Sequence, residues 1–377
     1  MHFSAIALRI PRGRCPLIGN RTSILASKAV DVKYSKKNIL LAAVIVIFAA
    51  AVVRTGVAIS GKAASARQRS FVFTYKVHIP ANPDVKGVDR LWIPLPQSDI
   101  HQSIRRLSIH TSVAYKLGKE QEYGNSYAVF SPKPAEISAG YEVALQFEVT
   151  RHEYVRDVKA PNAKAPAAAE AMLKRYLAPD QMVPLNATIA ELARTQTEGA
   201  TEPIERARRI YTYVASTMRY DKSGEGWGRG DEMWACDSKR GNCTDFHSVL
   251  IGMMRSSGIP ARFEIGFPLP EGKSEGDISG YHCWAEFYIE GLGWVPVDAS
   301  EASKNPAKRD YFFGAVDADR VMFTYGRDLR LSAEQKGDPL NYFIYPYAES
   351  NGRPVKGLTM HFAFHDLAPQ RAASSEN

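Results

Sequence analysis

The chain has 377 residues, 45% of them hydrophobic, which allows two or three packed units with cores of their own. Its formal net charge of +8 arises at the amino terminus, because residues 1–37 hold eight Lys or Arg against one Asp and Arg54 adds one more base. Residues 61–377 then contain 39 basic and 39 acidic side chains. This balance argues against nucleic-acid binding by the bulk of the protein.

The amino-terminal region has the pattern of a membrane-targeting segment. Residues 39–53 form an uncharged apolar run between Lys36-Lys37 and Arg54. Its length suits a long signal-peptide core, and continuation to Ile59 reaches the length of a membrane span. The positive-inside rule predicts a cytoplasmic tail at 1–37, a membrane anchor or cleavable signal segment at 38–60, and the rest of the chain in the periplasm or extracellular space.

Two alternatives stay open for this region. Cleavage at a small-x-small site, at 58–60 or 64–66, would release a secreted protein. A mitochondrial presequence is the second alternative, because residues 1–30 are rich in Arg and lack acids.

Residues 68–155 predict a small β-sandwich. Apolar side chains alternate with polar or small ones from Phe71 to Ile79 and from Tyr141 to Val149, which is the period of a half-buried strand. Shorter candidate strands lie between them at 90–95, 104–111 and 126–131. The segment 156–168 is rich in Ala, Pro and Lys without periodicity and is interpreted as a linker.

The first chemically distinctive stretch surrounds Cys243. After it, Phe246, Val249, Leu250 and Met253 follow the spacing of an amphipathic helix that ends before Gly258. Cys243 is therefore predicted at a helix N-terminus. There the unpaired N–H groups and the helix dipole favour a thiolate and can hold an oxyanion.

Two further stretches predict a β-hairpin. Residues 281–289 and 294–298 are aromatic and β-branched, and the loop between them contains two glycines. If Ile289 lies opposite Gly293, His282 and Asp298 are diagonal neighbours on one face, about 7–8 Å apart. Alternation then places Cys283 on the opposite face. Thiol, imidazole and carboxylate thus follow in the order of a nucleophile, its base and the group that orients the base.

The segment from Met182 to Asp298, with its GNCTDF, GYHCWAEF and GWVPVD motifs, resembles the core of the transglutaminase-like superfamily of cysteine enzymes. The resemblance implies that Cys243 is the nucleophile, His282 the general base and acid, and Asp298 the residue that holds the imidazole. It also implies an α+β, papain-like core at 169–305, in which the helix that bears the nucleophile packs on an antiparallel sheet. No metal or organic cofactor is required by such a mechanism.

A glycine-rich stretch at 222–235 precedes the nucleophile and contains Trp227 and Trp234. Its composition suits a mobile loop, and either tryptophan is a candidate to line the substrate groove or to donate its indole N–H to the oxyanion. The alternative for Trp234 is simple packing beneath the helix.

The remaining cysteines admit two other hypotheses. In an oxidising compartment Cys236 and Cys283 are candidates for a disulfide, which would leave Cys243 reduced. A zinc site of Cys236, Cys243, His282 and Cys283 is disfavoured, because the gap between Cys236 and Cys243 is wide and adjacent strand residues point apart.

Residues 306–367 return to a β-rich texture, with candidate strands from Tyr311, Val321, Tyr342 and Leu358 and a turn at Asn351-Gly352. They are expected either to extend the catalytic sheet or to form a small closing layer. The small polar residues 368–377 predict a disordered tail.

The chemistry predicts acyl transfer from an amide or peptide substrate through a Cys243 thioester. Water as acceptor gives a cysteine protease, isopeptidase or deamidase, and an amine gives a crosslinking transamidase. Hydrolysis is favoured, because the sequence shows no hydrophobic lysine tunnel and water is plentiful outside the membrane. A non-catalytic module that binds cell-envelope material is the alternative from another class.

Overall fold

The computed structural model describes residues 67–81, 87–159 and 170–368. The predicted cytoplasmic tail (1–37) and membrane segment (38–60) lie outside these residues, as do most of the linker (156–168) and the tail beyond Ala368. Within the described ranges, no helix combines the length and the apolar composition that crossing a bilayer would need.

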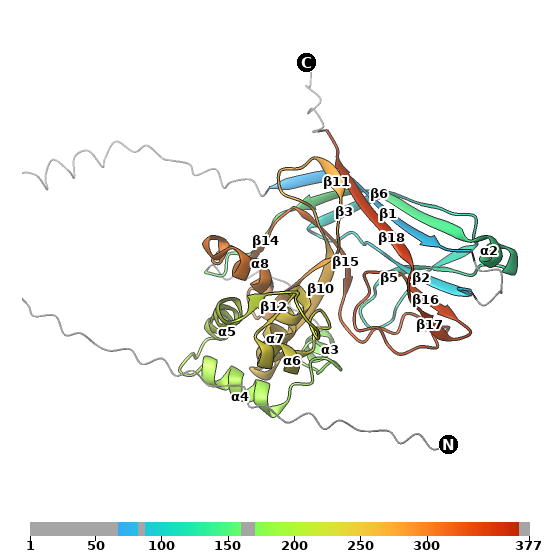
Figure 1. The fold of residues 1–377 in the computed structure, drawn as a ribbon. Coiled ribbons are helices and arrows are strands. Elements are labelled where there is room, and N and C mark those ends of the chain that lie inside the picture. The colour runs from blue at the N-terminus through green and yellow to red at the C-terminus, as the bar shows by residue number, and fades with distance from the viewer. Residues whose placement is uncertain (1–66, 82–86, 160–169, 369–377) are drawn as a thin grey trace, which may run out of the picture. The chain divides into compact units, whose positions relative to one another are not determined.

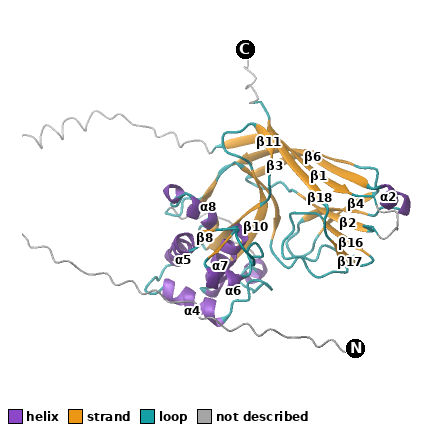
Figure 2. Cartoon of the chain, in the orientation of Figure 1, coloured by secondary structure: helices purple, strands orange, loops and turns teal. Residues whose placement is uncertain are grey.

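Two five-stranded antiparallel sheets form a β-sandwich on one side of the described unit (Figures 1 and 2). Alternate residues of β1 from Phe71 to Ile79 are buried, as the sequence pattern predicts. The first sheet has the order β11 (Glu275–Asp277), β18 (Thr359–Asp366), β1 (Gln68–Ile79), β6 (Tyr141–His152) and β3 (Gln102–His110). The second has the order β17 (Arg353–Val355), β16 (Tyr347–Ser350), β2 (Arg90–Leu95), β5 (Ser126–Phe130) and β4 (Tyr115–Lys119), and α2 (Pro134–Ala139) joins β5 to β6.

Strands from the carboxyl-terminal region complete both sheets of the sandwich. β18 pairs with β1, with Phe364 opposite Phe73, and β16 pairs with β2. The predicted turn at Asn351-Gly352 joins β16 to β17, and both residues have the positive φ (50° and 72°) that such a tight hairpin turn requires. The strand predicted from Tyr342 is wrong for most of its length, because β16 begins only at Tyr347.

A second layer combines a four-stranded antiparallel sheet with helices (Figure 1). The sheet has the order β13 (Gly293–Val297), β12 (His282–Ile289), β10 (Ala261–Pro268) and β15 (Arg320–Tyr325). The helices are α3 (Glu170–Arg175), α4 (Ala187–Gln196), α5 (Pro203–Thr217), α6 (Glu232–Ser238), α7 (Cys243–Ser256), α8 (Ala299–Lys304) and the 3₁₀ turn η1 (Pro306–Lys308). Two short pairs, β8 (Arg219–Tyr220) with β9 (Arg240–Gly241) and β7 (Tyr154–Val155) with β14 (Ala315–Val316), complete the layer.

Helix α7 is the centre of this layer. It packs against β10 and β12 and also contacts α4, α5, α6 and α8. Every residue from Cys243 to Arg255 is buried, so the helix presents no face to solvent. The helix predicted from the apolar spacing is confirmed. The spacing marked one buried face, whereas the structure encloses the helix on all sides.

The hairpin that follows α7 has the predicted register. Ile289 pairs with Gly293 and Ala285 with Val297, and all eight residues of β12 are buried. The chain leaves β13 at Val297 and enters α8 at Ala299, so Asp298 lies between the two elements. The start of β12 and the end of β13 therefore lie at the same end of the hairpin.

Candidate active site

Cys243 is the first residue of α7, and the local sequence fixes it there. The Asn242 side chain accepts a hydrogen bond from the Thr244 backbone N–H at 3.0 Å, and the Asp245 carboxylate accepts one from the Asn242 N–H at 2.9 Å. This reciprocal capping box begins the helix at Cys243. Because the Thr244 N–H is capped by Asn242 and the Asp245 and Phe246 N–H groups donate to the Asn242 carbonyl, the backbone N–H of Cys243 is the donor of this turn left for a developing negative charge.

Asp245 also anchors the glycine-rich segment that precedes the nucleophile. Its carboxylate accepts hydrogen bonds from the N–H groups of Gly228 (2.7 Å) and Gly230 (2.9 Å). Gly241 has φ 146°, and a Cβ there would lie 2.3 Å from an Asp245 oxygen. The glycine therefore makes room for the Asp245 carboxylate.

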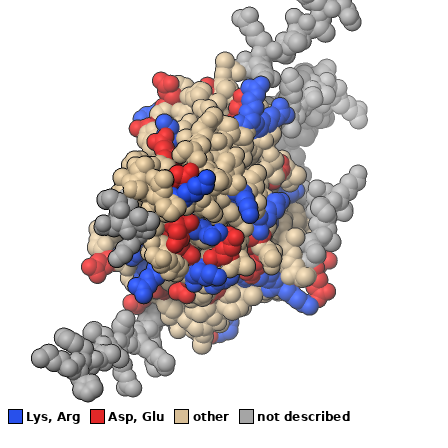
Figure 3. All heavy atoms as spheres, turned by 90° about the vertical axis from the view of Figure 1, so that its right-hand side faces the viewer, with Lys and Arg blue, Asp and Glu red and all other residues tan. Residues whose placement is uncertain are grey.

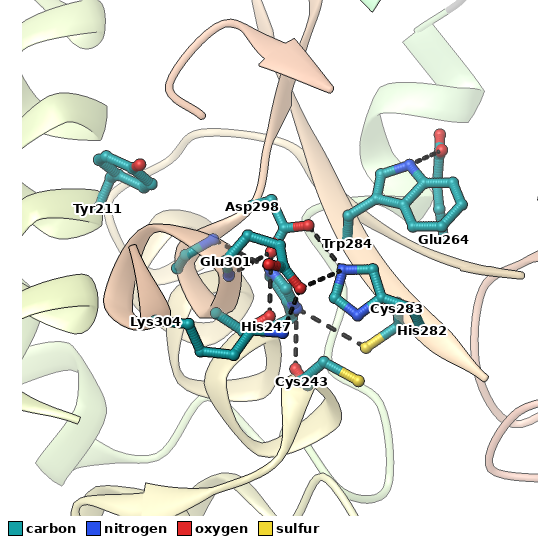
Figure 4. A network of polar contacts seen from close by, with 12 residues as sticks. Tyr211, Cys243, His247, Glu264, His282, Cys283, Trp284, Asp298, Glu301 and Lys304 are labelled. Atoms are coloured by element: carbon teal, nitrogen blue, oxygen red, sulfur yellow. Dashed lines mark hydrogen bonds and ion pairs between the residues drawn. The ribbon is translucent and has the colours of Figure 1, made fainter. Parts of the chain in front are cut away.

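His282 and Asp298 form the closest polar contact of the site. The Nε2 atom of His282 lies 2.7 Å from Oδ2 of Asp298, and the two residues are 5% and 0% exposed. The other Asp298 oxygen caps α8 by accepting from the Glu301 N–H at 3.0 Å. In Figure 4 the His282 ring lies between Asp298 above and the sulfur atoms of Cys243 and Cys283 below.

The electrostatics of the three side chains are coupled. Burial alone would lower the pKa of His282, but the charge and hydrogen bond of Asp298 and the contact with Cys243 outweigh it and raise the pKa to about 10. Burial would raise the pKa of Cys243, but hydrogen bonds from Cys283 and His282 and the charge of His282 hold it well below its usual value. The site therefore favours a thiolate beside an imidazolium.

Arg320 of β15 supports the carboxylate of this pair. Its Nη1 atom lies 3.2 Å from Oδ2 of Asp298, and its Nη2 atom lies 2.7 Å from Asp317. Burial would raise the pKa of Asp298, but His282 and Arg320 hold it well below its usual value. The sequence analysis missed Arg320, because its strand lies more than twenty residues after Asp298 and no motif marks it.

Two predictions about Cys283 are wrong. Its thiol forms a hydrogen bond with the Cys243 sulfur and lies 3.7 Å from Nδ1 of His247, so Cys283 lies beside Cys243 despite following His282 in the same strand. The predicted disulfide between Cys236 and Cys283 does not form in the described structure. Cys236 belongs to α6, whereas the Cys283 thiol is directed at the first turn of α7.

The two candidate tryptophans make their contacts within the preceding segment. The indole N–H of Trp227 donates to the Gly224 carbonyl at 3.1 Å. Trp234 lies in α6 with its indole nitrogen against Gly226 and with Arg240 5.5 Å from the ring centroid. Their predicted role at the oxyanion remains a prediction.

Tyr220 is an aromatic residue that the sequence analysis did not select. It ends β8, pairs with Gly241 two residues before Cys243, and has its ring 6.2 Å from that of Phe246. Burial raises the pKa of its hydroxyl, and the charge of Cys243 raises it further. The Tyr220 hydroxyl comes before Cys243 in the chain and lies close enough to feel its charge. It can therefore donate a hydrogen bond at this site.

Tyrosines lie near Cys243, a residue that is only 1% exposed. The Tyr281 hydroxyl accepts a hydrogen bond from the Asn242 side chain at 3.0 Å, and its ring lies 5.6 Å from Tyr342 and 5.7 Å from Tyr345. The Tyr342 hydroxyl donates to the Gly228 carbonyl at 3.2 Å. On another side, a cavity of about 470 Å³ reaches His282 and Glu301 and is lined largely by charged residues.

The side chains of His282, Asp298 and Glu301 place one ligand atom each within 4.8 Å of one another, which is a distance compatible with a shared cation. Arg320 and Lys304 already bind these two carboxylates, so a cation would compete with two positive side chains. We therefore treat the group as a proton-transfer network. Within the described residues, Cys236, Cys243, His282 and Cys283 do not form a group with the spacing of metal ligands.

Comparison with known proteins agrees with this geometry. Residues 190–299 match the profile of the "Transglutaminase-like superfamily". An uncharacterized protein of Haemophilus influenzae is 27% identical over 325 residues, covering 76% of this chain and 87% of that protein. The uncharacterized protein YebA of Bacillus subtilis is 29% identical over 107 residues, which cover 26% of this chain but only 14% of YebA.

A solved structure shares the arrangement of helices and strands. The crystal structure of a "Putative Cysteine Protease" from Cytophaga hutchinsonii superimposes with a TM-score of 0.55 at 13% identity, covering 82% of this chain and 94% of that one. At this identity the likeness concerns the fold. Residues 190–299, which include Cys243, His282 and Asp298, are therefore a segment similar to the transglutaminase-like superfamily.

Proposed function

We propose that the protein catalyses acyl transfer from an amide or peptide bond through a thioester on Cys243. The observation that carries this proposal is the contact of His282 with both Asp298, at 2.7 Å, and the Cys243 thiol. Because Nε2 of His282 is committed to Asp298, Nδ1 is the nitrogen left for the thiol. The thiolate is then present before substrate arrives.

The mechanism follows from these positions. The Cys243 sulfur attacks the substrate carbonyl carbon, and His282 gives its proton to the leaving amine as the carbon–nitrogen bond breaks. An acceptor then attacks the thioester, His282 takes the acceptor's proton, and the thiolate is restored. Asp298 stays ionised throughout and holds the imidazole in one tautomer.

The oxyanion of each tetrahedral intermediate needs at least two donors. We assign the backbone N–H of Cys243 as one and the Tyr220 hydroxyl as the second. Replacing Tyr220 by Phe is expected to lower turnover by about 10²-fold with little change in melting temperature. The matched replacements Trp227→Phe and Trp234→Phe test the alternative donors, and a loss confined to one of them would move the assignment to that residue.

Water is the acceptor that the surroundings of His282 favour. The cavity at His282 includes Glu271, Lys308 and Asp319, so it is polar and accessible to water. Hydrolysis would make the protein a cysteine protease, isopeptidase or deamidase acting on protein, peptide or cell-envelope material. A transamidase, which would deliver an amine to the same thioester, is the second candidate, and an idle triad in a binding module is the third.

One experiment separates these outcomes. The full chain and its Cys243→Ala variant are incubated with glutamine-containing peptides and cell-wall peptides, with and without a primary amine, and products are identified by mass spectrometry. A Cys243-dependent new carboxylate or amino terminus supports hydrolysis, and a Cys243-dependent amine adduct supports transfer. Alkylation of Cys243 with an ordinary midpoint near pH 8.5 would contradict both and favour the binding module.

We further propose that the catalytic unit lies outside the cytoplasm, attached through residues 38–60. The support is the apolar run with basic residues before it, together with a neutral composition for the remainder. On the face shown in Figure 3, Lys and Arg are interspersed with Asp and Glu. Protease protection in intact and permeabilised cells tests the proposal, and a domain digested only after permeabilisation of the inner membrane would refute it.

A further inference from the structure

A second buried histidine, His247, lies in α7 one turn after Cys243. Its Nδ1 atom is 2.8 Å from the backbone oxygen of Cys243, which can only accept, so Nδ1 carries the hydrogen. Its Nε2 atom is 3.2 Å from the backbone nitrogen of Ala299, which can only donate. The two contacts define a neutral ring in a single tautomer.

These contacts join the two ends of the catalytic arrangement. Cys243 begins α7, whereas Ala299 directly follows Asp298 and begins α8. The His247 ring therefore spans from the backbone of the nucleophile to the backbone beside the carboxylate (Figure 4). Because His247 is 0% exposed, close packing holds its ring in these two contacts.

The protonation state of His247 affects the Asp298 carboxylate. Its Nε2 lies 3.7 Å from Oδ1 of Asp298, an oxygen that already accepts from the Ser300 hydroxyl and the Glu301 N–H at 3.0 Å each. An imidazolium here would draw Asp298 toward α7 and weaken its attraction for His282.

The surroundings of the ring keep it neutral. The titratable groups that face it are Asp298 at the start of α8, Cys243 in its own helix, and His282 and Cys283 in β12. Burial lowers the pKa of His247, and the opposing influence of Asp298 and Cys243 does not reverse the shift. With His247 neutral and His282 charged, His282 is the histidine that forms an ion pair with the Asp298 carboxylate.

We propose that His247 is a positioning residue for the transfer reaction, which sets the distance between the nucleophile and Asp298 by bridging the Cys243 carbonyl and the Ala299 N–H. It touches no substrate atom and acts through Asp298 and the first turn of α7. The inference rests on the proposed function, because the bridge matters only if Cys243 reacts as a thiolate.

The test is the pH dependence of Cys243 alkylation in the full chain, followed by peptide mapping so that Cys15, Cys236 and Cys283 are read separately. His247→Leu removes both hydrogen bonds, whereas His247→Gln keeps an amide oxygen near the Nε2 position to accept from Ala299. The matched control is Val249→Ala, which leaves a cavity in the same buried helix without touching either bond.

In His247→Leu the midpoint of alkylation is expected to rise by about one pH unit, so that labelling at pH 6 falls about ten-fold. His247→Gln should retain most of the low midpoint, and Val249→Ala should retain all of it at a comparable loss of melting temperature. A His247→Leu protein with the midpoint of the unaltered chain would overturn the inference, since a purely structural residue would lower stability alone.

A second measurement covers the case in which His247→Leu does not fold. Nitrogen-15 chemical shifts of the histidine rings in the unaltered chain should show His247 neutral at pH 7, with hydrogen on Nδ1, and His282 charged at the same pH. A charged His247 at pH 7 would refute the bridge. If instead Cys243 of the unaltered chain titrates as an ordinary thiol, the proposed function itself fails, which is distinguishable from a failure confined to the His247 variants.

Discussion

The thiol of Cys283 donates a hydrogen bond to the Cys243 sulfur, so the residue that follows His282 in β12 also contacts Cys243. The backbone N–H of Cys283 contributes a further hydrogen bond to the same sulfur. Burial and the neighbouring Cys243 raise the pKa of Cys283 well above its usual value, so it stays protonated as a donor. The two sulfurs are adjacent but chemically unequal.

Replacing Cys283 by Ala is expected to raise the alkylation midpoint of Cys243, because one of the donors that stabilise its thiolate is lost. Cys283→Ser keeps a donor and should stay closer to the unaltered chain. Cys236→Ala is the matched control, since that residue lies in α6. A midpoint that Cys283→Ala leaves unchanged would show that the thiol contact contributes nothing to the charge of Cys243.

Asp298→Asn should abolish the raised pKa of His282. With a neutral side chain in place of the carboxylate, burial dominates, so the imidazolium loses its proton at lower pH and the thiolate loses its partner. Activity should fall by about 10²-fold or more, with alkylation at pH 6 reduced at least as strongly. Asp317→Asn is the control, because Asp317 also binds Arg320 but forms no hydrogen bond with His282 within the described residues. Equal losses in the two variants would attribute the effect to Arg320 rather than to His282.

Tyr342→Ala is expected to speed alkylation of Cys243 without moving its midpoint. The Tyr342 ring packs on Tyr281 above a thiol that is 1% exposed, and its hydroxyl ties it to Gly228. Removing the ring opens access while leaving the His282 contacts in place. Tyr347→Ala, in β16 and packed on Trp92, provides the comparison. If the Tyr342→Ala rate equals that of the unaltered chain, reagents reach the thiol by another route.

Glu232 makes stability depend on pH in an unusual direction. Burial raises its pKa to about 8, against the lowering influence of a Leu185 backbone hydrogen bond and of Arg255 and Arg327. In the unfolded chain a glutamate titrates near about pH 4.3. Between these two values the folded state binds the extra proton, so the free energy of unfolding falls as pH rises, by up to about 1.4 kcal/mol per pH unit.

Urea unfolding at several pH values from 4 to 9 measures this slope. In Glu232→Gln the contribution should vanish, and the difference between the two proteins should grow between pH 5 and 8 and then level off. Other groups titrate in both proteins alike, so the difference isolates Glu232. A difference that is constant with pH would mean that Glu232 is ionised in the folded state.

Much of the candidate site follows from local sequence. The helix after Cys243 is predicted from apolar spacing, and Asn242 and Asp245 cap it within four residues of chain. The register of Ile289 with Gly293 follows from the short loop between β12 and β13. These features depend on neighbours in the chain, which is why periodicity and turn residues are sufficient to find them.

The contacts that complete the site come from distant segments. Arg320 reaches Asp298 from β15, Tyr342 covers the thiol from a loop, and β16 and β18 close the amino-terminal sandwich. No local pattern marks such pairings, because they are decided by which side chains can share a buried volume. The same packing turned Cys283 toward Cys243, whereas alternation along the strand had assigned it to the other face.

The sequence by itself determined the residue types of the reaction, the helix that presents the thiol and the hairpin that carries His282, since hydrophobic period and capping act over a few residues. Only the tertiary structure decided the charge state of the site. Burial, Asp298 and Cys243 set the pKa of His282, burial, Cys283 and His282 set that of Cys243, and these groups meet only when the chain is packed around α7.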